Sequence, residues 1–247
     1  MTRLLLVRHA ESEHNAKGIV QGSVLDGPLS DRGREQARAL ARRLVADTKT
    51  GRGLLQGNPV TAIYASPLKR ADETAHILAE ALGLQVRHLP DMVEFNWGII
   101  SGKPLNPKSK AIMDQLFRQW AEGNPDFAPP GGESATTAFT RARGALDGVL
   151  AEHKEGSVIV VSHGRLLKII LAGLLDGDFT RMERFRHSNA GVNVLVREAE
   201  NGFKAVKLND TRHLRTAGGK KKHDPRTRGR SKSPNPPPLH DSGVRVD

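Results

Sequence analysis

Two histidines each follow an apolar run that is typical of a buried strand. His9 follows residues 3–8, of which 4–7 are apolar, and His163 follows the run at residues 157–162. In an open parallel α/β sheet, ligands bind in the crevice outside the carboxyl ends of the strands. We therefore expect both imidazoles to face one crevice, provided that their strands are neighbours.

Arginines accompany the two histidines and indicate an anionic ligand. Arg8 precedes His9, and Arg70 lies one turn into the helix predicted after a strand at residues 60–64. A guanidinium is planar, permanently charged and offers paired donors, which fits a phosphate dianion. We expect Arg8, Arg70 and His163 to surround His9 in a compact anion pocket.

The chain has no cysteine, and this narrows the chemistry. It excludes disulfides, thiolate metal sites and a cysteine nucleophile. A metal site built from His9, Glu13, His14 and His163 is the alternative, but the spacing of His9 and His14 differs from the His-Glu-x-x-His pattern of helical zinc sites. We predict neither a metal nor another cofactor.

The elements that must position these residues alternate between strand and helix. Strands are expected at residues 3–7, 60–64, 84–89 and 157–162, with a final hairpin of residues 192–197 and 203–208. Helices are expected at residues 35–45, 67–82, about 108–120, 134–153 and 165–175. The alternation predicts an α/β fold, a three-layer α/β/α sandwich with a mostly parallel central sheet.

The composition changes at about residue 214. We expect residues 1–214 to form one domain. Residues 215–247 hold nine Lys/Arg and three Asp, a net charge of +6 out of +11, and few apolar residues, so they predict a disordered, basic, Pro-rich tail. Binding of this tail to nuclear-import machinery or nucleic acid stays open.

No run of residues is long and apolar enough to span a bilayer. We therefore expect no membrane contact and a cytoplasmic location, with the nucleus as a second option.

Seven short motifs in this order resemble those of the histidine phosphatase superfamily, also called the phosphoglycerate mutase-like family. They are Arg8-His9-Ala10-Glu11-Ser12 with Asn15, Leu29–Ala37, Ser66–Ala71, Glu94 with Trp97-Gly98, Gly132–Ser134, Val161–Gly164 and Asn209–Leu214. The resemblance covers about residues 3–214. Two positions depart from the pattern: Ala10 replaces the usual Gly, and Ser101-Gly102 stands where many members have Glu-Gly.

The resemblance implies a phosphoglycerate mutase-like fold and a reaction. His9 would attack phosphorus and become a phosphohistidine, while Arg8, Arg70 and His163 hold the equatorial oxygens. Glu94 would protonate the leaving oxygen and later accept a proton from water, so it must carry a proton when substrate binds. The resemblance also assigns substrate binding to Asn15, Gln21, Gly22 and Gly164.

The function expected from these roles is a metal-independent phosphomonoesterase for a small phosphorylated metabolite. A cofactor-dependent phosphoglycerate mutase is the first alternative, but the segment between Glu94 and Gly132 is short for that branch. A non-catalytic scaffold or RNA-associated protein that uses the basic tail is the second. The presence of every expected catalytic residue argues against it.

Overall fold

A six-stranded sheet forms the centre of the domain in the computed structural model, which describes residues 2–198 and 202–215. The strands lie in the order β3-β2-β4-β1-β5-β6. Their bounds are β1 (Arg3–Arg8), β2 (Val60–Ala65), β3 (Val86–His88), β4 (Ser157–Ser162), β5 (Val192–Arg197) and β6 (Phe203–Asp210). Strands β1 to β4 are parallel and β5 and β6 are antiparallel, which confirms the mostly parallel sheet.

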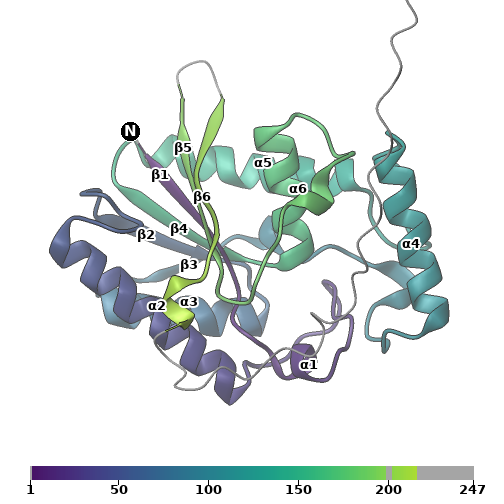
Figure 1. Cartoon of the computed structure of the whole chain (residues 1–247), viewed down its shortest axis with the longest axis horizontal. Coiled ribbons are helices and arrows are strands. Elements are labelled where there is room, and N and C mark those ends of the chain that lie inside the picture. The colour runs from purple at the N-terminus through teal and green to yellow at the C-terminus, as the bar shows by residue number, and fades with distance from the viewer. Residues whose placement is uncertain (1, 199–201, 216–247) are drawn as a thin grey trace, which may run out of the picture. The chain divides into compact units, whose positions relative to one another are not determined.

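Helices cover both faces of this sheet (Figure 1). Helices α2 (Asp31–Thr50) and α3 (Lys69–Leu82) lie on one face, and α5 (Ala135–Glu152) and α6 (Gly164–Leu175) lie on the other. Alternate residues of β1 show the two faces, because Leu5 and Val7 pack with α2 and α3 whereas Leu4 and Leu6 pack with α5 and α6. The predicted three-layer α/β/α sandwich is confirmed.

The helix boundaries follow from local capping. The sequence pattern predicts an N-cap at Ser30, a second one at Ser134 or Glu133, and a helix end at Gly83. In the structure Ser30 caps α2 by accepting from the Gly33 N–H, and Ser134 caps α5 by accepting from the Thr137 N–H. Gly83 ends α3 in the left-handed conformation. Helix α2 extends beyond the expected residues 35–45 at both ends. Hydrophobic spacing does not reveal its first and last turns, because these turns are polar.

Three predicted segments differ in detail from the structure. The polar residues 8–28, for which the sequence pattern predicts a loop, contain a short helix, α1 (Glu13–Ala16), whose N-terminus is capped by a capping box between Ser12 and Asn15. Helix α3 begins at Lys69 rather than at Pro67. The strand expected at residues 84–89 shrinks to β3, where only three residues pair with β2.

Residues 91–132 form a largely irregular segment between β3 and α5, here called the cap region, where the sequence pattern predicts a cap or insertion over the sheet. Its helix α4 (Pro107–Ala121) matches the expected helix at residues 108–120. Phe95 anchors this region through edge-to-face contacts with Trp97 and Trp120, whose ring centroids lie 4.9 Å and 5.5 Å away. Because Glu94 directly precedes Phe95, the aromatic cluster fixes the main chain that carries this carboxylate.

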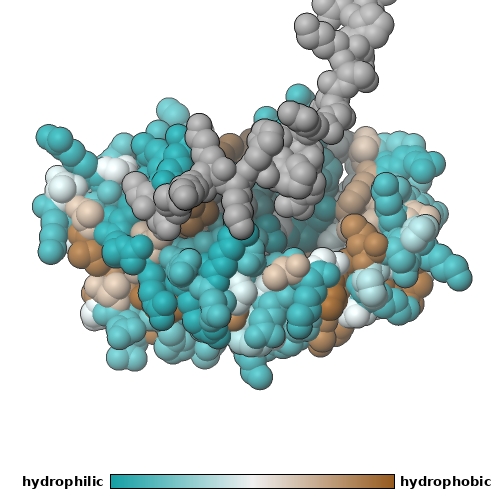
Figure 2. All heavy atoms as spheres, turned by 60° about the horizontal axis from the view of Figure 1, so that its bottom comes forward, coloured by the Kyte–Doolittle hydropathy of each residue, from teal (hydrophilic) through white to brown (hydrophobic). Residues whose placement is uncertain are grey.

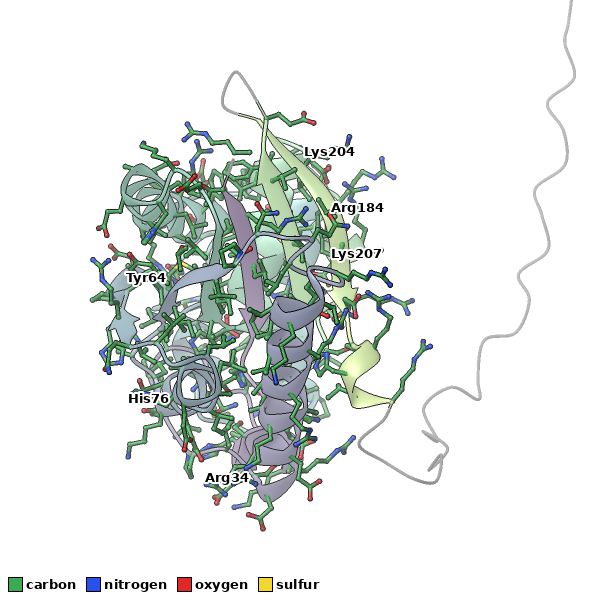
Figure 3. The ribbon with its side chains drawn as sticks, turned by 90° about the vertical axis from the view of Figure 1, so that its left-hand side faces the viewer. Arg34, Tyr64, His76, Arg184, Lys204 and Lys207 are labelled. Atoms are coloured by element: carbon green, nitrogen blue, oxygen red, sulfur yellow. The ribbon has the colours of Figure 1, made fainter. Side chains whose placement is uncertain are left out.

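The surface of the described residues is largely polar. Figure 2 shows the face on which α1 lies as mainly hydrophilic with scattered hydrophobic residues. On the edge strand β6, Lys204 and Lys207 point outward (Figure 3), a charge pattern that discourages pairing with further strands. None of the helices in residues 2–198 and 202–215 has the length and apolar character needed to cross a membrane. The predicted tail falls, apart from Arg215, outside the described residues, so its disorder and its partners stay predictions.

The close approach of α2 to the loop after His9 gives a test of the fold. A Cβ added at Gly33 would lie 1.9 Å from the Glu11 carbonyl oxygen. We expect Gly33→Ala to lower the free energy of unfolding by about 1–3 kcal/mol or more, because backbone atoms must move. Gly144→Ala is the matched control, since a Cβ at Gly144 on α5 meets nothing within 4 Å and should stabilise the helix by about 0.5–1 kcal/mol. Urea unfolding of both variants measures the difference, and equal effects would contradict the close packing.

Candidate active site

Three neighbouring parallel strands bring His9, Ser66 and His163 to one edge of the sheet. Arg8 pairs with Ser162 and Ala65 pairs with Val161, so the three following residues leave the sheet at the same level. The ring centroids of His9 and His163 are 5.2 Å apart, and the two side chains are almost completely buried. The predicted convergence of the two histidines is therefore what the structure shows.

The ring of His9 is held in one orientation. Its Nδ1 lies 2.7 Å from the carbonyl oxygen of Ala10, which can only accept, so the ring proton is on Nδ1. Burial, followed by the charges of Arg70 and Arg8, lowers the pKa of His9 well below the usual value of 6.5. A neutral ring with a free lone pair on Nε2 is the form that can attack an electrophile.

His163 presents its other nitrogen to the same space. Its Nε2 lies 2.8 Å from Ser66 Oγ, and this oxygen also accepts from the Leu68 N–H. We assign the Ser66 hydroxyl as the donor to Nε2, which places the ring proton of His163 on Nδ1. This nitrogen is buried without a hydrogen-bond partner among the described residues. Burial and the neighbouring Arg70 lower the pKa of His163 well below 6.5, so the neutral ring offers one N–H donor.

Arg70 is buried, and main-chain carbonyl oxygens accept hydrogen bonds from its guanidinium group. Its Nη1 and Nη2 donate to the carbonyl oxygens of Leu25 and Gly22 at 3.1 Å and 2.9 Å, and Asp26 lies 3.7 Å from Nη1. Its Nε has no partner among the described residues. Gly22 has φ +61°, and a Cβ there would come within 2.9 Å of Ser101 Oγ, so the tight turn that directs its carbonyl toward Arg70 favours glycine.

Arg8 reaches the same space from β1. Its Nη1 donates to the His187 carbonyl at 2.7 Å, whereas its buried Nε has no partner among the described residues. Burial lowers the pKa of Arg8, and the nearby carboxylate of Glu94 opposes this. A Cβ at Gly164 would lie 3.1 Å from Arg8 Nε, so Gly164 gives this guanidinium room beside α6. Two unpaired guanidinium N–H groups, from Arg8 and Arg70, and the Nδ1–H of His163 thus form the expected anion pocket.

Glu94 lies at the N-terminus of α6. Its Oε1 accepts from the N–H groups of Leu166 and Phe95 at 3.0 Å and 2.9 Å, and its Oε2 accepts from the Arg165 N–H at 3.3 Å. The carboxylate thereby caps a helix whose own N-cap residue, His163, makes no side-chain cap bond. The sequence analysis missed this capping role. Among the described residues, Oε2 makes only this one long hydrogen bond.

The remaining predicted substrate-binding residues line or support the pocket. Asn15 accepts from the Ser12 N–H through Oδ1 at 3.3 Å, and Gln21 Nε2 donates to Ser12 Oγ at 2.9 Å. Gly22 and Gly164 act through main-chain geometry, as described above. Direct contact of these four residues with a substrate stays a prediction.

One further supporting residue was not identified from the sequence. Thr74 is fully buried on α3, where its Oγ1 donates to the Arg70 carbonyl at 2.7 Å and accepts from the Ala10 N–H at 3.1 Å. It joins the helix of Arg70 to the loop of His9. The only signal for it is a polar residue on the apolar stripe of α3, beside the buried Ala71 and Ala75.

The metal set considered as an alternative does not assemble. Glu13 is exposed, and the ring of His14 packs against Gly27, where an added Cβ would lie 2.5 Å from its Nδ1. Within the described ranges, no three His, Asp or Glu side chains gather as metal ligands would. The positive charge of the pocket comes from Arg8 and Arg70.

Comparison with known proteins agrees with this geometry. The family model described as "Histidine phosphatase superfamily (branch 1)" matches residues 4–211. Phosphoserine phosphatase 1 of Hydrogenobacter thermophilus is 35% identical over 87% of this chain and 95% of its own length. Phosphoglycerate mutase-like protein 4 of Arabidopsis thaliana is 34% identical over 67% of each chain. The mycobacterial glucosyl-3-phosphoglycerate phosphatase, solved with VO3, is 26% identical with a TM-score of 0.70 and covers 84% of this chain and 98% of its own.

Burial of neutral histidines predicts a loss of stability in mild acid. Besides His9 and His163, burial lowers the pKa of His187 to about 3 and of His213 to about 4. The unfolded chain takes up protons on these rings near pH 6.5, but the folded domain does not. The contribution of these rings to the free energy of unfolding is therefore fully present above pH 6.5. It falls as the pH drops toward 4, by up to about 1.4 kcal/mol per pH unit for each ring.

Urea unfolding of the wild type at pH 7 and pH 5 measures this fall. His213→Gln should reduce the pH dependence, because it removes one of the buried rings. A midpoint that is equal at both pH values would contradict the neutral state of the buried rings.

Proposed function

Because the chain belongs to branch 1 of the histidine phosphatase superfamily and is a phosphoric monoester hydrolase, we propose that it hydrolyses a small phosphorylated metabolite without a metal, through a phosphohistidine at His9. One observation carries this proposal: a neutral, buried imidazole with its Nε2 free lies beside the buried guanidinium group of Arg70 and the half-buried one of Arg8, each with a buried Nε that has no partner among the described residues. The arginines supply the positive charge that a metal supplies in other phosphatases.

The reaction proceeds in two transfers. Nε2 of His9 attacks phosphorus in line while the bond from phosphorus to the ester oxygen breaks, and Glu94 gives its proton to the departing alcohol. The N–H groups of Arg8, Arg70 and His163 hold the equatorial oxygens in both transfers. Water then attacks the phosphohistidine, Glu94 takes the proton of this water, and the N–P bond breaks to release phosphate and the original imidazole.

The body of the substrate would lie against two joined loops. The Val20 N–H donates to the Lys103 carbonyl at 3.2 Å, and the Gly102 N–H donates to the Val20 carbonyl at 2.7 Å, so main-chain hydrogen bonds join residues 19–25 to residues 97–105. The first of these loops also holds Arg70. The names of the relatives, phosphoserine phosphatase and glucosyl-3-phosphoglycerate phosphatase, support a small organic phosphate as the substrate.

Removal of the nucleophile tests the proposal. We expect the wild type to hydrolyse an aryl phosphate and at least one member of a panel that includes phosphoserine and phosphoglycerates, with full activity in EDTA. We expect His9→Ala to lose about 10³-fold or more in kcat and to incorporate no acid-labile label from a ³²P-labelled substrate. His76→Ala, at an exposed histidine, is the control.

Two results would contradict this function. Acid-labile label on the His9→Ala variant would show that another residue is the nucleophile. Rapid isomerisation of 3-phosphoglycerate that depends on a bisphosphate primer, with little release of phosphate, would instead identify a mutase.

The leaving group tests Glu94. Glu94→Gln keeps an oxygen for the N–H groups of α6 but has no proton to give to an alcohol. We expect its kcat/KM, which reports the transfer to His9 and not the later attack of water, to fall about 100-fold or more for alkyl phosphates but less than about tenfold for p-nitrophenyl phosphate, whose leaving group needs no proton. Equal losses for both substrates would indicate that Glu94 only caps the helix.

A further inference from the structure

The loop at residues 188–191 lies directly against the main chain of the nucleophile. The Ala190 N–H donates to the carbonyl oxygens of Arg8 and His9 at 3.1 Å and 3.3 Å. Ala190 is fully buried and has φ +55°, a conformation that is costly for a residue with a side chain. Such a conformation persists only when the surrounding structure holds it, so we expect the contacts of this loop to have a function.

Asn189 connects this loop to two groups of the pocket. Its Nδ2 donates to the His9 carbonyl at 3.2 Å and to Asn15 Oδ1 at 3.1 Å. Asn15 Oδ1 also accepts from the Ser12 N–H. Because the amide oxygen of Asn15 is taken by two donors, its Nδ2 is the atom left to donate to a phosphate oxygen.

Asn209 holds the loop from the other side. Its Oδ1 accepts from the Ser188 N–H at 2.8 Å and its Nδ2 donates to Ser188 Oγ at 3.3 Å. The Asn209 N–H donates to Asn193 Oδ1 at 2.9 Å, and φ is +47°, which asparagine tolerates better than most residues. A Cβ at Gly191 would lie 2.4 Å from Asn209 Oδ1, so the loop and the side chain fit closely.

The end of β6 is itself anchored. Asp210 accepts from Arg43 Nη1 on α2 at 2.6 Å and from Arg212 Nε at 2.9 Å. The carboxylate is nearly inaccessible to solvent, which makes this pair firmer than a surface salt bridge. The motif Asn209–Leu214 is thus tied to α2 on one side and to the loop behind His9 on the other.

We propose that Asn189 and Asn209 are positioning residues, which fix the main chain of His9 for attack and turn the Asn15 amide toward the phosphate. This rests on the proposed role of His9 as nucleophile. Neither asparagine contacts the reacting atoms. Asn209 acts through Ser188, and Asn189 acts through the His9 carbonyl and Asn15.

Four variants test the proposal. Asn189→Ala removes both donations, and Asn209→Gly removes the side chain while still permitting φ +47°. Asn209→Asp keeps an acceptor for the Ser188 N–H and serves as the conservative variant. Asn58→Ala is the control, because its side chain also bonds main-chain carbonyls in a turn, those of Leu55 and Gln56, but before β2 at the opposite end of the strands.

The first readout is steady-state hydrolysis of p-nitrophenyl phosphate. We expect kcat of Asn189→Ala and Asn209→Gly to fall about 10- to 100-fold, as a displacement near 1 Å does, with a smaller change in KM. Asn209→Asp should recover to within about threefold of the wild type, and Asn58→Ala should keep full kcat even if it unfolds at lower temperature. Thermal unfolding of each variant shows that the folded fraction is unchanged in the assay.

The second readout is the ¹⁵N resonance of the His9 ring without substrate. The wild type should show the tautomer with the proton on Nδ1, and Asn189→Ala and Asn209→Gly should show a mixture of both tautomers. Unchanged His9 signals in these variants would overturn the proposal, as would losses of kcat that Asn58→Ala shares. If the wild type is itself inactive, the proposed hydrolysis fails, and the ring resonances still decide whether the asparagines position His9.

Discussion

The placement of two guanidinium groups beside two neutral imidazoles is the interaction on which the site depends. Arg70 is buried and Arg8 is half-buried. Carbonyl oxygens accept from both groups, and the nearby carboxylates of Glu94 and Asp26 offset a further part of the cost of burying charge. Burial, and then the charges of these nearby cations, lower the pKa of His9 and of His163 well below 6.5. This arrangement of positive charge and neutral donors is suited to a dianion.

The strand order of the sheet explains how the chain brings the residues of this pocket together. β4 lies between β1 and β2, so the residues after three parallel strands converge although they are far apart in sequence. His9 and Ser66 approach His163 from its two sides. The helices then complete the site, with Thr74 joining α3 to the His9 loop and Glu94 closing the N-terminus of α6.

Much of this arrangement could be predicted from the sequence, and the exceptions share a cause. The strand before His9, the strand before His163 and the caps at Ser30 and Ser134 are visible because they depend on neighbouring residues. The cap that Glu94 makes on α6 and the contact of Asn209 with Ser188 join segments 72 and 21 residues apart. Hydrophobic spacing carries no information on such contacts. The four-residue α1 is too short for any periodicity to reveal it.

The hydrogen bonds from Arg70 to the carbonyl oxygens of Gly22 and Leu25 have an evolutionary consequence. The loop that borders the space for the substrate body is also the loop that orients a phosphate-binding guanidinium. A new specificity cannot arise by freely lengthening or shortening residues 21–26, because two carbonyl oxygens must keep their places. Descendants of this chain would instead diversify through side chains on a loop of constant length, or through the cap segment around α4, whose helix makes no hydrogen bond to Arg70 among the described residues.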